Sequence, residues 1–289
     1  AERVVVTQLV RSPGPYYDVT TDKSNNRLYS TTIIPNRGAW LEYETDSNEI
    51  ISVRVDRTRK QPVTTILRAL AYKTVEEKIE LEKRKDPQIT EPELQKKIRR
   101  YNVFATNIAK TLREGTDEEI LAVFGENDRL QRSIAKDTTG TCDEGLKEIY
   151  KKLRPGEPAT FESAYDLIEA LFFDAKRYDL AKVGRYKYNK KLGLGNRIVG
   201  CVAAADVTAP WTGEILVEKG VKIDRETAYA IENAGVESLL VYGKSDAKNV
   251  CKVIGNNFVA IDRFVDFDTK ASKIPQKVYF PVLRHILET

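Results

Sequence analysis

The sequence predicts an α+β protein, in which a mixed β-meander and helices form a larger domain and a small β-rich module follows. Three observations support this class. Short β-branched stretches, separated by Pro and Gly turns, fill the first 56 residues. Charged, helix-typical segments with capping pairs dominate from residue 62 to about residue 192. Short strand-like stretches return after Asn196, which indicates a compact β-rich module with helix support.

The opening section is predicted to be a β-meander. The β-branched segment RVVVTQLV (3–10) indicates a buried strand. RSPGP (11–15) indicates a turn, because its prolines fix φ and its glycine supplies conformational freedom. A second turn is expected at PNRG (35–38). The remaining strands are expected over residues 29–34, 39–44 and 50–55.

Helices are expected after the meander. Pro62 precedes a predicted helix over 63–72, at a position where the missing N–H of proline costs nothing. Residues 73–115 are rich in Glu, Lys and Arg and predict a charged helical hairpin, most simply a solvated face. Capping boxes are predicted for Thr74 with Glu77, Thr90 with Glu93 and Thr116 with Glu119. Later helices are expected over 146–153 and, capped by Thr160, over 161–173.

The predicted organisation has three parts. Residues 1–195 form the larger domain, interrupted by the charged insertion at about 73–115. Residues 196–265 form the β-rich module, and residues 266–289 a linker with the truncated start of a further element. Within the module, strands are expected over 198–203, 214–217, 239–242 and 257–262, and a helix over 225–234.

Length and composition exclude several classes of protein. The chain has 289 residues, begins at Ala1 and contains no methionine, so we expect a processed product or a piece of a longer protein. The longest uncharged apolar run, residues 198–205, is far too short to cross a membrane. The three cysteines are too widely spaced for a disulfide framework or a zinc ribbon. These features favour a reduced, cytoplasmic location.

No catalytic or metal-binding residue is predicted. His285 is the single histidine, so zinc sites and His-based triads lack their usual ligands and bases. The segment Gly193-Leu194-Gly195 lacks the lysine and the third glycine of a phosphate-binding loop. Acid pairs such as Glu157 with Asp174 have no predicted pocket around them. A stand-alone hydrolase or transferase is therefore the weaker hypothesis.

The net charge of +4 hides two basic stretches. Residues 54–60 carry four positive charges against Asp56, and residues 176–191 carry seven against Asp179. Arginines and aromatic residues are also interleaved on predicted turns. Because arginine binds phosphate bidentately and aromatic rings stack on unpaired bases, this mixture favours nucleic-acid binding.

The alternative is that these side chains serve the fold. Trp40 alone is better explained by packing, because a large aromatic residue in a strand is usually part of the core. Nearby acids, such as Glu42 and Glu44, could pair with the arginines. Asp56, however, can neutralise only one charge within residues 57–60, which favours a phosphate-facing role there.

Five segments resemble consecutive blocks of the β subunit of bacterial DNA-directed RNA polymerase, in the family's order. They are RSPGPYYD (11–18), IIPNRGAWLEYE (33–44), VRVDRTRKQPVTTILRAL (53–70), LRPGEPAT (153–160) and LFFDAKRYDLAKVGRYKYNKKL (171–192). With flanking residues, the similarity covers about residues 1–72 and 116–195. Residues 196–265, notably TGEILVEKG (212–220), resemble the module that follows in Firmicutes-type β subunits, which implies a barrel-sandwich-like insertion. Pro15 and the insertion at 73–115 depart from the family pattern.

The resemblance implies that the chain is the β lobe, one wall of the DNA cleft, which contacts the nontemplate strand and the downstream duplex. Trp40 would stack on a nontemplate base, and Arg11 would line the pocket of a neighbouring flipped base. Asp56 would orient Arg57. The implied DNA-binding residues are Arg11, Trp40, Arg57, Arg154 and Arg177, with Asp56 as a supporting residue.

The resemblance also implies partners and chemistry. The expected partners are DNA, the other polymerase subunits and σ factor, with no membrane, at a cytoplasmic and nucleoid-associated location. The parent enzyme would be a nucleotidyltransferase whose Mg²⁺ is bound by another subunit, so this chain is expected to hold no cofactor and no catalytic residue. The alternative function is a protein-docking module that binds a transcription factor through the insertions at 73–115 and 196–265.

Overall fold

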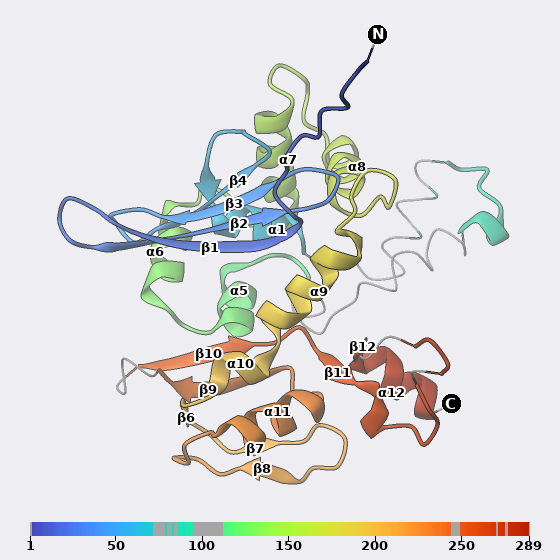
Figure 1. The fold of residues 1–289 in the computed structure, drawn as a ribbon. Coiled ribbons are helices and arrows are strands. Elements are labelled where there is room, and N and C mark those ends of the chain that lie inside the picture. The colour runs from blue at the N-terminus through green and yellow to red at the C-terminus, as the bar shows by residue number, and fades with distance from the viewer. Residues whose placement is uncertain are drawn as a thin grey trace. The chain divides into compact units, whose positions relative to one another are not determined.

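The structure is a computed structural model, and it divides the chain into two compact units, residues 1–181 and 182–289. It describes residues 2–71, 79, 83, 86–94, 112–243, 249–269, 271–274 and 277–288. Both units combine helices with open sheets, so the predicted α+β class is confirmed (Figure 1). The predicted lobe and module boundaries stay a prediction.

The first unit is built on a five-stranded antiparallel meander whose strands lie side by side in chain order. Its strands are β1 (Gly14–Thr21), β2 (Arg27–Ile34), β3 (Leu41–Thr45), β4 (Ile51–Val55) and β5 (Gln61–Pro62). Ile33 pairs with Leu41, which sets the register across the predicted turn at 35–38. The predicted strands β2, β3 and β4 and the turn between β2 and β3 are therefore confirmed.

Two predictions at the N-terminal end of the chain are wrong. Residues 3–10 form no strand and are exposed throughout, and they run away from the sheet (Figure 1). Their β-branched composition favours a strand, but a strand needs a hydrogen-bonding partner, and no described residue pairs with them. Gly14 and Pro15, expected in a turn, instead begin β1. Proline is tolerated there because β1 is an edge strand.

Helices of the first unit pack beside the sheet. They are α1 (Val63–Ala69), α5 (Asp117–Phe124), α6 (Asp128–Lys136), α7 (Cys142–Leu153) and α8 (Phe161–Phe172). The capping box of Thr116 with Glu119 and the cap at Thr160 are confirmed. Helix α6 was not predicted. Most of the predicted helical hairpin at 73–115 lies outside the described residues, although the Glu93 carboxylate accepts a 2.8 Å hydrogen bond from the Thr90 hydroxyl.

A buried arginine holds these helices together. Arg68 of α1 is 1% exposed and forms ion pairs with Asp117, at the start of α5, and with Asp137, which follows α6. Its guanidinium also donates to the carbonyl oxygens of Gly115, at 2.6 Å, and Gly140, at 3.1 Å. Since each buried donor has an acceptor, the charge is tolerated in the core.

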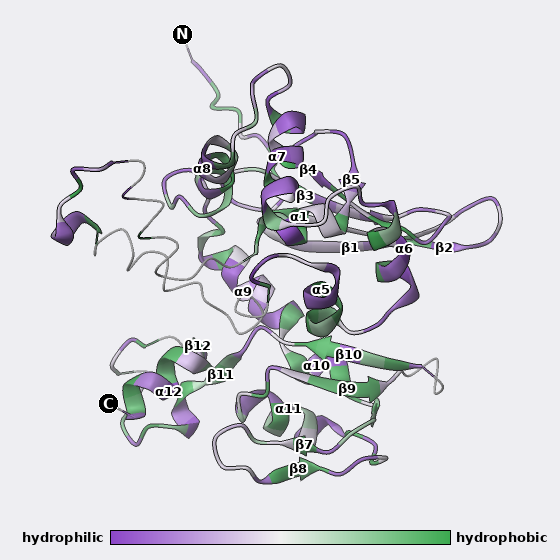
Figure 2. Ribbon diagram, turned by 180° about the vertical axis from the view of Figure 1, so that it is seen from behind, coloured by the Kyte–Doolittle hydropathy of each residue, from purple (hydrophilic) through white to green (hydrophobic). Residues whose placement is uncertain are grey.

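The second unit contains three small antiparallel sheets, ordered β10-β9-β6, β7-β8 and β11-β12. Strands β9 and β10 are largely hydrophobic (Figure 2), and Val241 of β9 packs in a core with Ile198 and Ile231. The elements are α9 (Ala181–Leu192), α10 (Leu194–Ile198), β6 (Val202–Ala203), β7 (Val207–Thr208), β8 (Ile215–Val217), α11 (Arg225–Asn233), β9 (Ser238–Tyr242), β10 (Val250–Ile254), β11 (Phe258–Ala260), β12 (Lys277–Tyr279) and α12 (Phe280–Glu288).

The second unit confirms some element predictions and corrects others. The helix over 225–234 and the strands near 214–217, 239–242 and 257–262 are confirmed as α11, β8, β9 and β11. The predicted strand over 198–203 is wrong in its first half, because Ile198 ends helix α10. After residue 265 the chain forms β12 and α12, and Phe280 and Leu283 of α12 form a core with Val259 and Ile261. The barrel-sandwich detail stays a prediction.

No helix among the described residues combines the length and the apolar character needed to cross a membrane.

Candidate nucleic-acid interface

The turn between β2 and β3 carries Trp40 and is held by a segment far away in the sequence. The backbone N–H groups of Asn36 and Arg37 donate to the Asp179 carbonyl oxygen at 2.8 and 3.1 Å, and Asp179 N–H donates to Arg37 O at 2.9 Å. Gly38 has a φ of +122°, and a β-carbon there would lie 2.6 Å from the Tyr178 ring. Only glycine therefore allows this close approach.

The turn after β4 brings Arg57 to the same region. Asp56 and Arg57 both have positive φ, 42° and 66°, and Thr58 N–H closes the turn on Val55 O at 3.0 Å, the pattern of a type I′ turn. The Asp56 N–H also donates to Trp40 O at 2.9 Å. Residues 35–40, 56–60 and 174–179 thus meet, and we call them the turn surface.

Packed aromatic side chains support the turn surface. The Tyr178 ring packs edge-on against Phe172, with centroids 5.9 Å apart. Burial raises the pKa of Tyr178, and burial, with Tyr178 nearby, raises the pKa of Tyr43 to about 12. Both phenols therefore stay neutral at physiological pH and add no charge to the turn surface.

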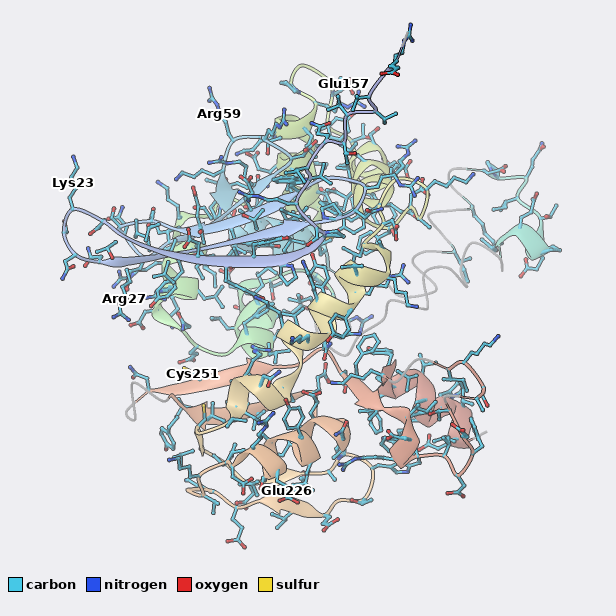
Figure 3. The ribbon with its side chains drawn as sticks, viewed as in Figure 1. Lys23, Arg27, Arg59, Glu157, Glu226 and Cys251 are labelled. Carbon is cyan, nitrogen blue, oxygen red and sulfur yellow. The ribbon has the colours of Figure 1, made fainter. Side chains whose placement is uncertain are left out.

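Among the described residues, the unpaired positive charge of the turn surface comes from Lys176, which is exposed, and from three arginines. Arg37, Arg57 and Arg59 are exposed and form no ion pair with any described residue. The Arg59 side chain points outward from its turn (Figure 3). Lys60, in contrast, is paired with Glu44 at 2.8 Å. Arg54 lies opposite Glu42 across the sheet and is paired with it at 3.5 Å, as the alternative based on pairing predicts for that arginine.

The structure brings together only some of the predicted site residues. Trp40, which is 40% exposed, Asp56, Arg57 and Arg177 all belong to the turn surface. The Arg177 guanidinium lies 3.6 Å from the Asp174 carboxylate, so its charge is partly neutralised. No ion pair joins Asp56 to Arg57 in the described part of the chain; Asp56 instead contributes its backbone hydrogen bond to Trp40.

The other two predicted residues lie on separate segments. Arg154 follows the C-terminus of α7 and is paired with Glu157 at 3.5 Å. Arg11 is exposed in the segment before β1. No contact of either residue with the turn surface is found among the described residues, so their part in the site stays a prediction.

Sequence reasoning did not select Arg37 and Arg59 as site residues. Arg37 stands three residues before Trp40, within the predicted turn, and Arg59 follows Arg57 at a spacing of two. Both signals were visible in the sequence. The sequence does not show that Arg37 and Arg59 are unpaired whereas Lys60 and Arg54 are paired. That difference depends on which acidic residues the strand register places near each basic side chain.

The backbone at Arg57 predicts a conflict between stability and binding. A left-handed conformation costs a non-glycine residue about 1–2 kcal/mol, and glycine avoids this cost. Glycine also makes the unfolded chain more flexible, which offsets about 0.5–1 kcal/mol of the stabilisation. Arg57→Gly is therefore expected to raise the free energy of unfolding by about 0.5 kcal/mol while weakening DNA binding. Urea denaturation beside a DNA titration checks both signs. A loss of stability would contradict this account of the turn.

Comparison with known proteins supplies a family for this chain. The family model described as RNA polymerase Rpb2, domain 2, matches residues 11–133 and 108–198, which include all three segments of the turn surface. The chain belongs to this family. The resemblance found in the sequence is thereby confirmed.

Individual relatives of the family agree with this assignment. DNA-directed RNA polymerase subunits beta from Alkaliphilus metalliredigens and Alkaliphilus oremlandii are 52% and 50% identical to the chain over 289 residues. The subunit from Clostridium botulinum strain Loch Maree is 50% identical over 288 residues. The match covers 100% of this chain and 20% of each relative, so the chain spans about a fifth of their length.

The described residues contain no group of three His, Cys, Asp or Glu side chains suited to hold a metal ion. The turn surface can bind anions and stack on rings, because its exposed groups include guanidinium groups and an indole. It offers no nucleophile with an adjacent base.

Proposed function

We propose that the turn surface binds the unpaired nontemplate strand of DNA during transcription, as part of a DNA-directed RNA polymerase. One observation carries this proposal: an exposed tryptophan stands among three arginines that form no ion pair with an acid in the described ranges, on turns fixed by backbone hydrogen bonds. Trp40 stacks on a base, and Arg37, Arg57 and Arg59 bind phosphates on either side.

Binding by this surface is electrostatic and independent of base identity. Every base has a face on which an indole can stack, and guanidinium groups contact phosphates that carry no sequence information. A duplex keeps its bases stacked inside, so Trp40 gains a partner only where the strands are separated. The surface therefore favours single-stranded over double-stranded DNA at equal salt concentration.

The remaining roles follow from membership of the polymerase. The whole enzyme performs template-directed nucleotidyl transfer, while this chain holds DNA and leaves the Mg²⁺ chemistry to another subunit. Arg11 lines the pocket of a flipped base beside Trp40, and Arg154 and Arg177 face phosphates, with affinity limited by their acidic neighbours Glu157 and Asp174. The downstream duplex, σ factor and the other polymerase subunits are further partners, at the nucleoid.

A salt titration tests the proposal. The chain is expected to bind a labelled single strand weakly, with an affinity that falls steeply with salt. Replacing Arg37, Arg57 and Arg59 by Gln removes three phosphate contacts, so the slope of log K against log salt should flatten by about 2. Fluorescence anisotropy at several salt concentrations measures this slope.

A control variant of equal charge separates the site from net charge. Arg27, Arg225 and Arg263 are exposed elsewhere, and Gln at these positions lowers the net charge by the same three units. The control is expected to change the slope by less than half as much as the turn-surface variant does. Equal slopes for the two triple variants would contradict the proposed site.

A further inference from the structure

Helix α9 (Ala181–Leu192) presents a row of exposed side chains with alternating chemistry. Lys182, Tyr186 and Lys190 are spaced four residues apart, so they lie one above the other on one face of the helix. Tyr186 is 65% exposed, and Val183 beside the row is also exposed. Gly184 is the one buried residue of α9.

Packing does not account for this row. An aromatic side chain stabilises a fold through the area it buries, and Tyr186 buries little. Ion pairing within the helix does not account for it either, because α9 contains no acidic residue. Neither Lys182 nor Lys190 forms an ion pair with another described residue.

We infer that the row Lys182-Tyr186-Lys190 binds single-stranded nucleic acid. Tyr186 is the stacking platform for one base, and the two lysines neutralise phosphates on either side of it. A duplex would engage the lysines but leave the tyrosine ring without a base. An acidic protein segment would likewise pair with the lysines and gain little from the ring.

This site is separate from the turn surface. Its three residues belong to the second unit, whereas the turn surface belongs to the first, and the two share no residue. The inference therefore does not rest on the proposed function. It adds a second contact for a single strand to the same chain, through a helix face in place of fixed turns.

The inference is tested with single and double variants of the 289-residue chain. Fluorescence anisotropy measures their affinity for a labelled, mixed-sequence, single-stranded oligodeoxynucleotide of about 16 nucleotides. Tyr186→Leu is expected to weaken binding about tenfold, because stacking on one base is lost, while Tyr186→Phe binds as the parent does. Lys182→Gln with Lys190→Gln should flatten the slope of log K against log salt by about 1.4. All variants are also measured with Trp40→Ala, where binding by the turn surface is weakened.

The control and the contradicting outcomes are specific to the row. Lys219 and Lys222 are exposed in the same unit, and Gln at both removes equal charge. This control should change the slope by less than half as much. The inference is overturned if Tyr186→Leu binds the single strand with the same affinity as Tyr186→Phe. It is also overturned if the two double lysine variants change the slope of log K against log salt equally. It is also overturned if polyglutamate competes as well per charge as the single strand, which would indicate a surface for acidic proteins. Circular dichroism confirms that each variant is folded.

Discussion

Replacing Asp137 by Asn is expected to lower the free energy of unfolding by about 3 kcal/mol, because Arg68 loses its one fully buried carboxylate partner and keeps only Asp117, whose side chain is 50% exposed. The Asp137 side chain is 1% exposed and lies 3.4 Å from the Arg68 guanidinium. It also accepts hydrogen bonds from the hydroxyl groups of Thr64, at 2.5 Å, and Thr65, at 3.1 Å. Urea denaturation followed by circular dichroism measures the loss.

The pH dependence of this effect has a defined sign. Burial raises the pKa of Asp137, but hydrogen bonds from Thr64, Thr139 and Thr65 outweigh it and hold the pKa below its ordinary value. The stabilisation is therefore complete above the unfolded pKa of about 4 and is lost as the pH falls through the lower folded pKa. The difference in the free energy of unfolding between the parent and Asp137→Asn should become smaller below about pH 4.

A half-buried ion pair serves as the control for Asp137, whose side chain is almost fully buried. Glu148 and Lys152 form a pair at 3.0 Å, one turn apart on α7. Glu148→Gln should change the free energy of unfolding by no more than about 0.5 kcal/mol. If Asp137→Asn were as mild as this control, Arg68 would not be the residue that joins α1, α5 and α6.

Replacing Trp40 by Ala is expected to weaken binding of a single strand about 5- to 150-fold, since stacking on one base contributes about 1–3 kcal/mol. The turn itself should survive, because its backbone hydrogen bonds to Asp56 and Asp179 do not involve the indole. In a polymerase assembled with this variant, the lifetime of the promoter complex should shorten. Anisotropy and a promoter-complex decay assay measure the two effects.

The second tryptophan of the chain is a matched control. Trp211 is 38% exposed, close to the 40% of Trp40, but its ring stacks on Phe264 with centroids 5.7 Å apart. Trp211→Ala should therefore reduce stability and leave DNA affinity nearly unchanged. An equal loss of affinity in both variants would point to unfolding as the cause and would remove the stacking role of Trp40.

Much of the fold could be predicted from local sequence. Strands β2 to β4 carry β-branched and aromatic residues, and the turn between β2 and β3 contains Pro35 and Gly38. Thr116 and Thr160 cap their helices as expected. The prediction of a strand over residues 3–10 was wrong, because strand propensity does not indicate whether a partner strand is present. Strand β1 was missed because it is largely polar and exposed, so its residues give no buried face to recognise.

The candidate site was only partly predictable. Trp40 and Arg57 stand next to turn residues, and this places them on the surface. The joining of residues 36–37 to Asp179 is a tertiary contact between segments more than 130 residues apart, and no local pattern encodes it. Lys60 is paired and Arg59 is not, because the register of β3 places Glu44 near Lys60.

Tryptophan fluorescence tests the central claim most directly, because the chain contains two tryptophans and the site contains one. Trp211→Phe keeps the stack on Phe264 and leaves Trp40 as the single reporter. Adding a single strand of DNA should quench the emission of Trp40, with a midpoint that matches the affinity from anisotropy, and duplex DNA should quench less. In the Trp40→Phe chain, the emission of Trp211 should stay constant. Binding by anisotropy without any change in Trp40 emission would contradict the account.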